Sequence, residues 1–162
     1  MATNKKPGKW HKRTLAVRGG QLRSGFQETS EALFMTSGYA YEEAEEAEAR
    51  FKGESPGYQY SRFGNPTVSM FEERMAALEG APVGRATATG MAAVSAALMA
   101  GLSAGDHIVA AKAMFGSCLH VVTNILPRFG ITHTLVDGED IRAWEAAIQP
   151  NTKMLFLETP SN

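Results

Sequence analysis

The sequence is poor in the features that mark several common classes of protein. Its single cysteine, Cys118, allows no intramolecular disulfide, which fits a reducing compartment. No apolar run reaches 18 residues and no signal-peptide pattern is present, so we expect a cytoplasmic protein. The net charge is only −1, whereas nucleic-acid-binding domains usually carry a strong basic excess. Neither a nucleic acid nor a membrane is therefore an expected partner.

Signatures of metal and nucleotide sites are also scarce. The four histidines show no metal-ligand spacing with one another or with Cys118, so no metal site is expected. Neither Gly-x-x-x-x-Gly-Lys nor Gly-x-Gly-x-x-Gly occurs, which disfavours an unrelated nucleotide-binding α/β domain.

The second half of the sequence alternates between strand-like and helix-like stretches. Strands are predicted at 85–89, 107–111, 131–136 and 152–157, and helices at 91–102, from 116 to about 127, and at 140–148. In the last helix Ile141, Trp144 and Ile148 are expected to face inward. This β-α-β-α-β-α-β order predicts an α/β fold with a mostly parallel sheet, in which ligands gather at the carboxyl ends of the strands.

The first part of the sequence has a different character. Residues 1–26 carry seven Lys or Arg, no acid and several glycines, which predicts an extended lead-in. An acidic run at 42–48 predicts a short amphipathic helix. Asn65-Pro66 predicts a helix start and Gly80 its end, with a core-facing stripe of Val68, Phe71, Met75 and Leu78.

The stretch from Arg85 to Ala93 is read as a strand, a glycine turn and a helix N-terminus. Such a junction leaves backbone N–H groups unpaired at the positive end of a helix dipole, which suits a phosphate. We therefore expect Thr89, Gly90 and Met91 to cradle a phosphate; the alternative is an ordinary strand-helix corner without a ligand. Phe115, on a glycine-flanked loop, is a candidate to lie over a flat ring, with ordinary loop packing as the alternative.

Several motifs occur in an order typical of one enzyme family. They are Tyr60-Ser-Arg62, Asn65-Pro-Thr67, Phe71-Glu-Glu73, Leu78-Glu-Gly80, Thr89-Gly-Met-Ala-Ala93, Gly105-Asp-His-Ile-Val109 and Glu158-Thr-Pro-Ser-Asn162. With them the chain, from about residue 14 onward, resembles the Cys/Met-metabolism family of pyridoxal-phosphate enzymes, the cystathionine γ-synthase-like group. Within the family it is most similar to the sulfhydrylases of O-succinylhomoserine, judged by the runs 35–39, 49–51 and 113–117.

The resemblance implies an architecture. Residues 1–60 would form an N-terminal arm and short helix that contact a neighbouring subunit, and 61–162 the first, incomplete part of the large cofactor-binding domain of a fold-type I pyridoxal-phosphate enzyme. The expected partner is then a second copy of the chain, in a homotetramer whose active sites are shared between subunits.

The resemblance also implies roles for six residues. Tyr60 and Arg62 would bind the cofactor phosphate of the neighbouring subunit. Tyr60 would also have a catalytic role. Gly90 and Met91 would bind the phosphate of their own subunit through backbone N–H groups. Phe115 would stack on the pyridine ring, where many relatives place a tyrosine whose hydroxyl could move protons. Asn162 would lie near the ring oxygen and the substrate carboxylate.

The family's Schiff-base lysine and the aspartate that pairs with the pyridine nitrogen have no counterpart in these 162 residues. The chain alone is therefore predicted to be inactive, with the missing C-terminal part of the same enzyme as a further partner. Lys112 is a poor substitute, because nothing adjacent would lower its pKa. The implied reaction is a γ-replacement that makes homocysteine from O-succinylhomoserine and sulfide. The alternatives are a cystathionine γ-synthase or γ-lyase, and a non-catalytic phosphate-binding module.

Overall fold

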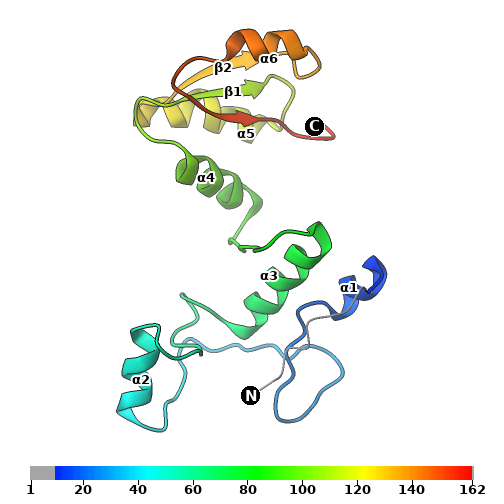
Figure 1. Cartoon of the computed structure of the whole chain (residues 1–162), viewed down its shortest axis with the longest axis vertical. Coiled ribbons are helices and arrows are strands. Elements are labelled where there is room, and N and C mark those ends of the chain that lie inside the picture. Colours follow the sequence, from blue (N-terminus) through cyan, green and yellow to red (C-terminus); the bar gives the residue numbers. More distant parts are fainter. Residues whose placement is uncertain (1–9, 162) are drawn as a thin grey trace. The chain divides into compact units, whose positions relative to one another are not determined.

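The computed structural model describes residues 10–161, so the predicted site residue Asn162 lies outside the described residues. The chain packs into two units, which divide between Ala86 and Thr87, and each is described by itself. Figure 1 shows helices α1 to α3 in the first unit and a sheet with its helices in the second. This division reflects packing, so the boundary between an arm at 1–60 and a large domain at 61–162 stays a prediction.

The second unit contains a three-stranded parallel sheet, which confirms the predicted α/β class. Its strands are β1 (His107–Ala111), β2 (Thr132–Val136) and β3 (Thr152–Phe156), each within one residue of its predicted limits. The helices α4 (Gly90–Gly101), α5 (Gly116–His120) and α6 (Ile141–Ala147) alternate with them. Helix α5 continues through a π-helical turn, Val121–Ile125, and a 3-10 turn, Leu126–Phe129, to a left-handed Gly130.

The order of strands across the sheet is β2-β1-β3, and both neighbours run parallel to β1. The chain therefore crosses in one direction from β1 to β2 and returns across β1 to reach β3. Right-handed crossovers in opposite directions place α5 and α6 on opposite faces of the sheet, as Figure 1 shows. Because β1 and β3 are parallel neighbours, the loops that follow them leave the same edge of the sheet.

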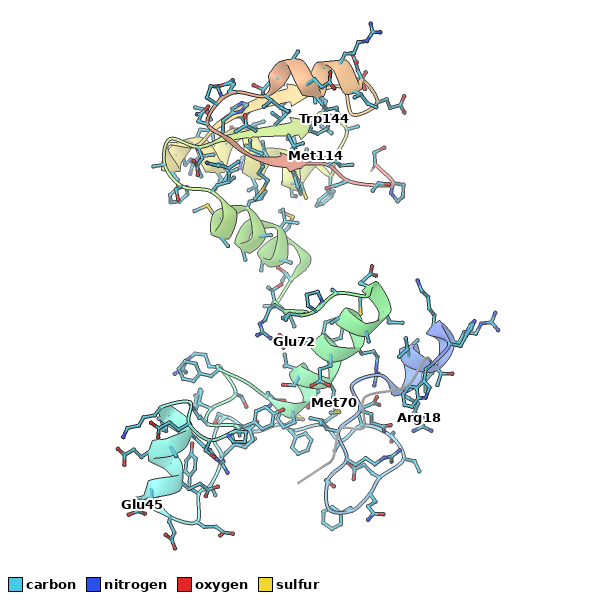
Figure 2. The ribbon with its side chains drawn as sticks, viewed as in Figure 1. Arg18, Glu45, Met70, Glu72, Met114 and Trp144 are labelled. Carbon is cyan, nitrogen blue, oxygen red and sulfur yellow. The ribbon has the colours of Figure 1, made fainter. Side chains whose placement is uncertain are left out.

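The core of this unit lies on the face covered by α4 and α5. Strand β1 is buried along its whole length, and Ile108 and Ala110 contribute its side chains to the core. Met114, labelled in Figure 2, packs into the same cluster. The helices contribute Leu98, Leu102, Cys118, Val121, Val122 and Leu126. Val122 and Leu126 are fully buried, which anchors the helix after Gly116 on the sheet.

Two stretches of the second half of the sequence differ from the sequence predictions. No strand is present at Arg85–Thr89, because this stretch pairs with no other strand of residues 10–161 and the Ala86 N–H donates to the Glu72 carboxylate at 2.8 Å. In α6, Ile141 and Ile148 are 73% and 54% exposed rather than inward. Helix α6 has only seven residues, so Ile141 lies at its first position, and Ile148, in extended backbone, has left the helical period.

The opposite face of the sheet carries a buried histidine that links all three strands. His107 is 1% exposed; its Nδ1 lies 2.8 Å from Thr152 Oγ1 on β3, and its Nε2 lies 3.0 Å from Thr134 Oγ1 on β2. Burial, and to a smaller extent the charge of His133, lowers the pKa of His107 below its usual value. The imidazole is therefore neutral in the folded protein near pH 7.

This histidine predicts a loss of stability in acid. Below about pH 6.5 the unfolded chain binds a proton that the folded His107 does not, so the free energy of unfolding falls as the pH drops, by at most about 1.4 kcal/mol per pH unit. Urea denaturation at pH 7 and pH 5 is expected to show this slope, and His107→Gln should remove that part of it. The control for the substitution itself is His120→Gln, the same change at an exposed histidine. An equal slope in wild type and His107→Gln would contradict the assignment.

The first unit is built from α1 (Lys12–Arg18), α2 (Ala44–Phe51) and α3 (Pro66–Glu79). The predicted limits of α3 are confirmed: Asn65 Oδ1 accepts the Thr67 N–H at 2.8 Å, and Gly80 ends the helix in the left-handed conformation. The predicted helix in the acidic run is confirmed as α2. In the described part of the chain no helix has the length and apolar content needed to cross a bilayer.

Two predictions for the first unit are wrong. Helix α1 replaces the extended lead-in, because Lys12–Arg18 contains no glycine and the His11 side chain accepts the Arg13 N–H at its start. The predicted apolar stripe of α3 is largely exposed, with Phe71 at 55%, whereas Met70 is buried. The reason is that α3 packs on α1 through its other side, where Arg74 Nε donates to the Gly19 carbonyl at 2.8 Å.

Candidate functional site

Helix α4 begins as the sequence predicts, with free donors at its N-terminus. Thr89 Oγ1 caps the helix by accepting the Ala92 N–H at 3.0 Å, and the Thr89 hydroxyl keeps its own proton to donate. In the described structure no acceptor lies within hydrogen-bonding range of the N–H groups of Gly90 and Met91. Two backbone donors and a hydroxyl therefore surround the positive end of a twelve-residue helix.

There is room for a ligand in front of these donors. Thr89 and Gly90 are exposed, and a Cβ placed on Gly90 would meet no atom within 4 Å. A phosphate fits this chemistry, since each of its oxygens accepts hydrogen bonds and its charge is favoured by the helix dipole. Among the described residues no group of three or more His, Cys, Asp or Glu side chains could hold a metal ion.

Phe115 lies at the start of α5, on the loop that follows β1. Its side chain is 45% exposed, and its carbonyl accepts the Leu119 N–H at 3.0 Å. Its N–H donates to Glu158 Oε2 at 2.8 Å, and Glu158 lies just beyond the end of β3. The ends of the two neighbouring strands are thus joined by a hydrogen bond beside an aromatic ring that has an open face.

A sulfur contact connects this loop with α4. The thiol of Cys118, on α5, lies 4.0 Å from the Met91 sulfur on α4. Burial, followed by the nearby Glu158 carboxylate, raises the pKa of the Cys118 thiol above its usual value, so the thiol stays protonated. The structure therefore brings the first turn of α4, the first turn of α5 and the segment after β3 to one place, which is the convergence that the parallel-sheet prediction requires.

Tyr60 and Arg62 belong to the first unit and form a compact pair. The Arg62 guanidinium carbon lies 4.4 Å from the centroid of the Tyr60 ring and 5.5 Å from that of Phe63. Both residues of the pair are exposed, so the guanidinium donors and the phenol are accessible. Contact with two rings restricts the guanidinium before any ligand arrives, which favours binding of a phosphate through two parallel hydrogen bonds.

Buried polar contacts hold the loop that carries this pair. The Asn65 amide donates to the Ser61 hydroxyl and to the Phe34 carbonyl, both at 2.9 Å. The Ser61 N–H donates to the Ser37 carbonyl at 2.9 Å, next to an antiparallel bridge between Gly38 and Tyr60. The run 35–39, which resembles the sulfhydrylases in sequence, therefore positions Tyr60 directly.

Glu158 is a site residue that sequence reasoning missed. The run 158–162 stands out in the sequence as a strand end, but a bond between residues 43 positions apart leaves no local pattern, so the carboxylate had no expected contact. Lys112 is exposed, and its N–H is bonded to the Val136 carbonyl at 2.9 Å, in continuation of the sheet.

Comparison with known proteins shows which family this chain resembles in sequence and in fold. The sequence profile of the family described as Cys/Met metabolism PLP-dependent enzyme, where PLP is pyridoxal phosphate, matches residues 13–162. An O-succinylhomoserine sulfhydrylase of Mycobacterium tuberculosis is 56% identical over 149 residues, which cover 92% of this chain and 37% of the relative. An L-methionine gamma-lyase of Porphyromonas gingivalis is 40% identical over 149 residues, which again cover 92% of this chain and 37% of the relative. The chain thus spans little more than a third of the length of these relatives.

A solved structure shows the same fold. It is a putative O-acetylhomoserine (thiol)-lyase from Campylobacter jejuni that carries an N'-pyridoxyl-lysine-5'-monophosphate. It superposes with a TM-score of 0.88 at 33% identity, over 94% of this chain and 38% of that one. The fold predicted for the beginning of a fold-type I large domain is thereby confirmed. The chain belongs to the Cys/Met metabolism family, whose enzymes depend on pyridoxal phosphate.

Proposed function

We propose that the full-length protein, meaning the polypeptide of the relatives' length that carries this chain, makes homocysteine from O-succinylhomoserine and sulfide. The reaction replaces succinate at the γ carbon by sulfide, in a homotetramer of the cytoplasm. The observation that carries the proposal is the 56% identity to an O-succinylhomoserine sulfhydrylase, against 40% to a methionine γ-lyase over the same 149 residues.

The residues of this chain are assigned to holding the cofactor. The N–H groups of Gly90 and Met91 bind the phosphate at the N-terminus of α4, where the donors and the space described above fit a phosphate ester. Arg62, with the Tyr60 hydroxyl, binds the phosphate of a neighbouring subunit's cofactor, because a guanidinium fork matches the geometry of a dianion. In this proposal Asn162 lies near the ring oxygen and the substrate carboxylate. When bound, pyridoxal phosphate supplies the electron sink for the reaction.

Phe115 contributes the ring that stacks on the cofactor. Its exposed face fits this role, and it brings no hydroxyl to the site. A phenol at this position could carry protons, so its absence favours a replacement reaction over an elimination that depends on proton transfer there. Tyr60 is the residue of this chain proposed to take part in catalysis.

The proposal predicts a ranking of reactions for the purified full-length protein with pyridoxal phosphate. Homocysteine formation from O-succinylhomoserine and sulfide is expected to have a kcat/KM at least about ten times that of each of two competing reactions. This ratio corresponds to about tenfold stronger binding of its transition state. The competing reactions are cystathionine formation with cysteine in place of sulfide, and 2-oxobutanoate release from methionine or cystathionine.

Each competing result has a defined meaning. Faster elimination from methionine would replace the proposal by a γ-lyase, and faster reaction with cysteine by a cystathionine γ-synthase. Cofactor binding without turnover of any of these substrates would indicate the non-catalytic module.

A further inference from the structure

We infer that Glu158 is a positioning residue that sets the orientation of the Phe115 ring over the cofactor. The inference rests on the proposed function, because it assigns Glu158 a task at the same site. It is carried by the hydrogen bond from the Phe115 N–H to Glu158 Oε2, at 2.8 Å, between the loop after β1 and the end of β3.

The start of α5 explains why an outside carboxylate is needed. In a capping box, the residue three positions into the helix sends a Glu or Gln side chain back to the N–H of the capping residue. Here the capping residue is Phe115, whose side chain makes no capping hydrogen bond, and the residue three positions on is Cys118. Neither supplies an oxygen, so Glu158 supplies it from the neighbouring strand end.

The hydrogen bond from the Phe115 N–H to Glu158 influences the orientation of the ring because few other contacts fix the ring. The Phe115 side chain is nearly half exposed, so its orientation follows the backbone to which it is attached. That backbone is fixed on one side by the Leu119 N–H, which binds the Phe115 carbonyl, and on the other by Glu158. An ionised acceptor forms a stronger bond than a neutral one, and stacked rings interact well only in a narrow range of offsets.

The surroundings of Glu158 agree with a carboxylate directed inward to this turn. Besides the Phe115 N–H, it lies close enough to the buried Cys118 thiol to raise the pKa of that thiol. Cys118 in turn contacts Met91, one of the two residues that bind the phosphate in the proposed function. Glu158 thus connects the part of the site that holds the ring with the part that holds the phosphate.

The test is a double-mutant cycle in the full-length protein with Glu158→Ala and Phe115→Leu. Glu158→Ala is expected to raise the dissociation constant of pyridoxal phosphate about 5- to 10-fold, as for loss of one hydrogen bond of ordinary strength, and to change the visible circular dichroism of the bound cofactor. In the Phe115→Leu background the same substitution should change the dissociation constant by less than about 2-fold, because the ring that it positions is absent.

Further variants keep the test decisive if Glu158→Ala does not fold. Glu158→Gln retains an acceptor oxygen, so its dissociation constant for pyridoxal phosphate should stay within about 3-fold of wild type. Glu158→Asp has a side chain one methylene shorter and should lose affinity for the cofactor only when Phe115 is present. In the cofactor-free protein, amide hydrogen exchange of the segment 113–119 should be faster in Glu158→Asp than in wild type.

The outcomes separate this inference from the function on which it rests. Equal losses of affinity on Glu158→Ala, with and without the Phe115→Leu substitution, would leave Glu158 as a structural residue and overturn the inference alone. A wild-type full-length protein that binds no pyridoxal phosphate would overturn the proposed function as well.

Discussion

Arg62→Ala in the assembled full-length protein is expected to weaken retention of pyridoxal phosphate about 100-fold, the effect of losing two hydrogen bonds between charged partners. The guanidinium already contacts the rings of Tyr60 and Phe63, so less conformational freedom is lost when it binds the phosphate. Equilibrium titration of the cofactor-free protein with pyridoxal phosphate measures the change. The exposed Arg128, on the turn after α5, supplies the control, because Arg128→Ala should leave the affinity unchanged.

A mixing experiment tests whether Arg62 acts on a neighbouring subunit. Gly90→Glu places a carboxylate at the phosphate-binding N-terminus of α4, in open space where it disturbs no packing. At a pyridoxal phosphate concentration near the wild-type dissociation constant, Arg62→Ala and Gly90→Glu should each be nearly inactive alone. Co-expressed in equal amounts they should regain about a quarter of wild-type activity, because half of the subunit pairs are mixed and each mixed pair has one intact site. Mixed oligomers without any recovery would show that Arg62 serves its own subunit.

The parts of the fold that could be predicted are those with local signals. Helix α3 begins and ends where Asn65-Pro66 and Gly80 predict, since a capping side chain and a left-handed glycine act on their immediate neighbours. The three strands of the sheet were predicted within a residue, because a short apolar or alternating run bounded by turn residues can be recognised without knowledge of its partners.

The parts that could not be predicted depend on distant contacts. Phe71 and Met70 are both apolar residues of α3, and only the packing of α1 decides that Met70 is the buried one. The alternation of alanine and threonine in Arg85–Thr89 suits a strand, but a strand needs a partner strand, and here the Ala86 N–H bonds to the Glu72 side chain instead. The periodicity of apolar residues in the sequence indicates which side chains can be buried. The packing of the elements decides which of them are buried.

The same distinction applies to the candidate site. The donors at Gly90 and Met91 follow from a local rule about helix N-termini, and the convergence of strand ends follows from a parallel sheet. By contrast, the bond between Phe115 and Glu158 depends on the order β2-β1-β3, which makes β1 and β3 neighbours. No pattern within either segment indicates that order, so the positioning role of Glu158 emerges only from the structure.

The 162-residue chain by itself is expected to show no turnover and no lysine-dependent absorbance band when pyridoxal phosphate is added. Among the described lysines, Lys52 is paired with Glu48, and Lys112 is exposed to water, unlike a nucleophilic lysine that is desolvated in an apolar pocket. Difference spectra with and without Lys112→Ala measure this directly. In the full-length protein the same substitution should leave kcat within about 2-fold, because a lysine outside the catalytic machinery contributes no transition-state binding. A band that vanishes with Lys112→Ala would mean that this lysine, and not one beyond these residues, binds the cofactor.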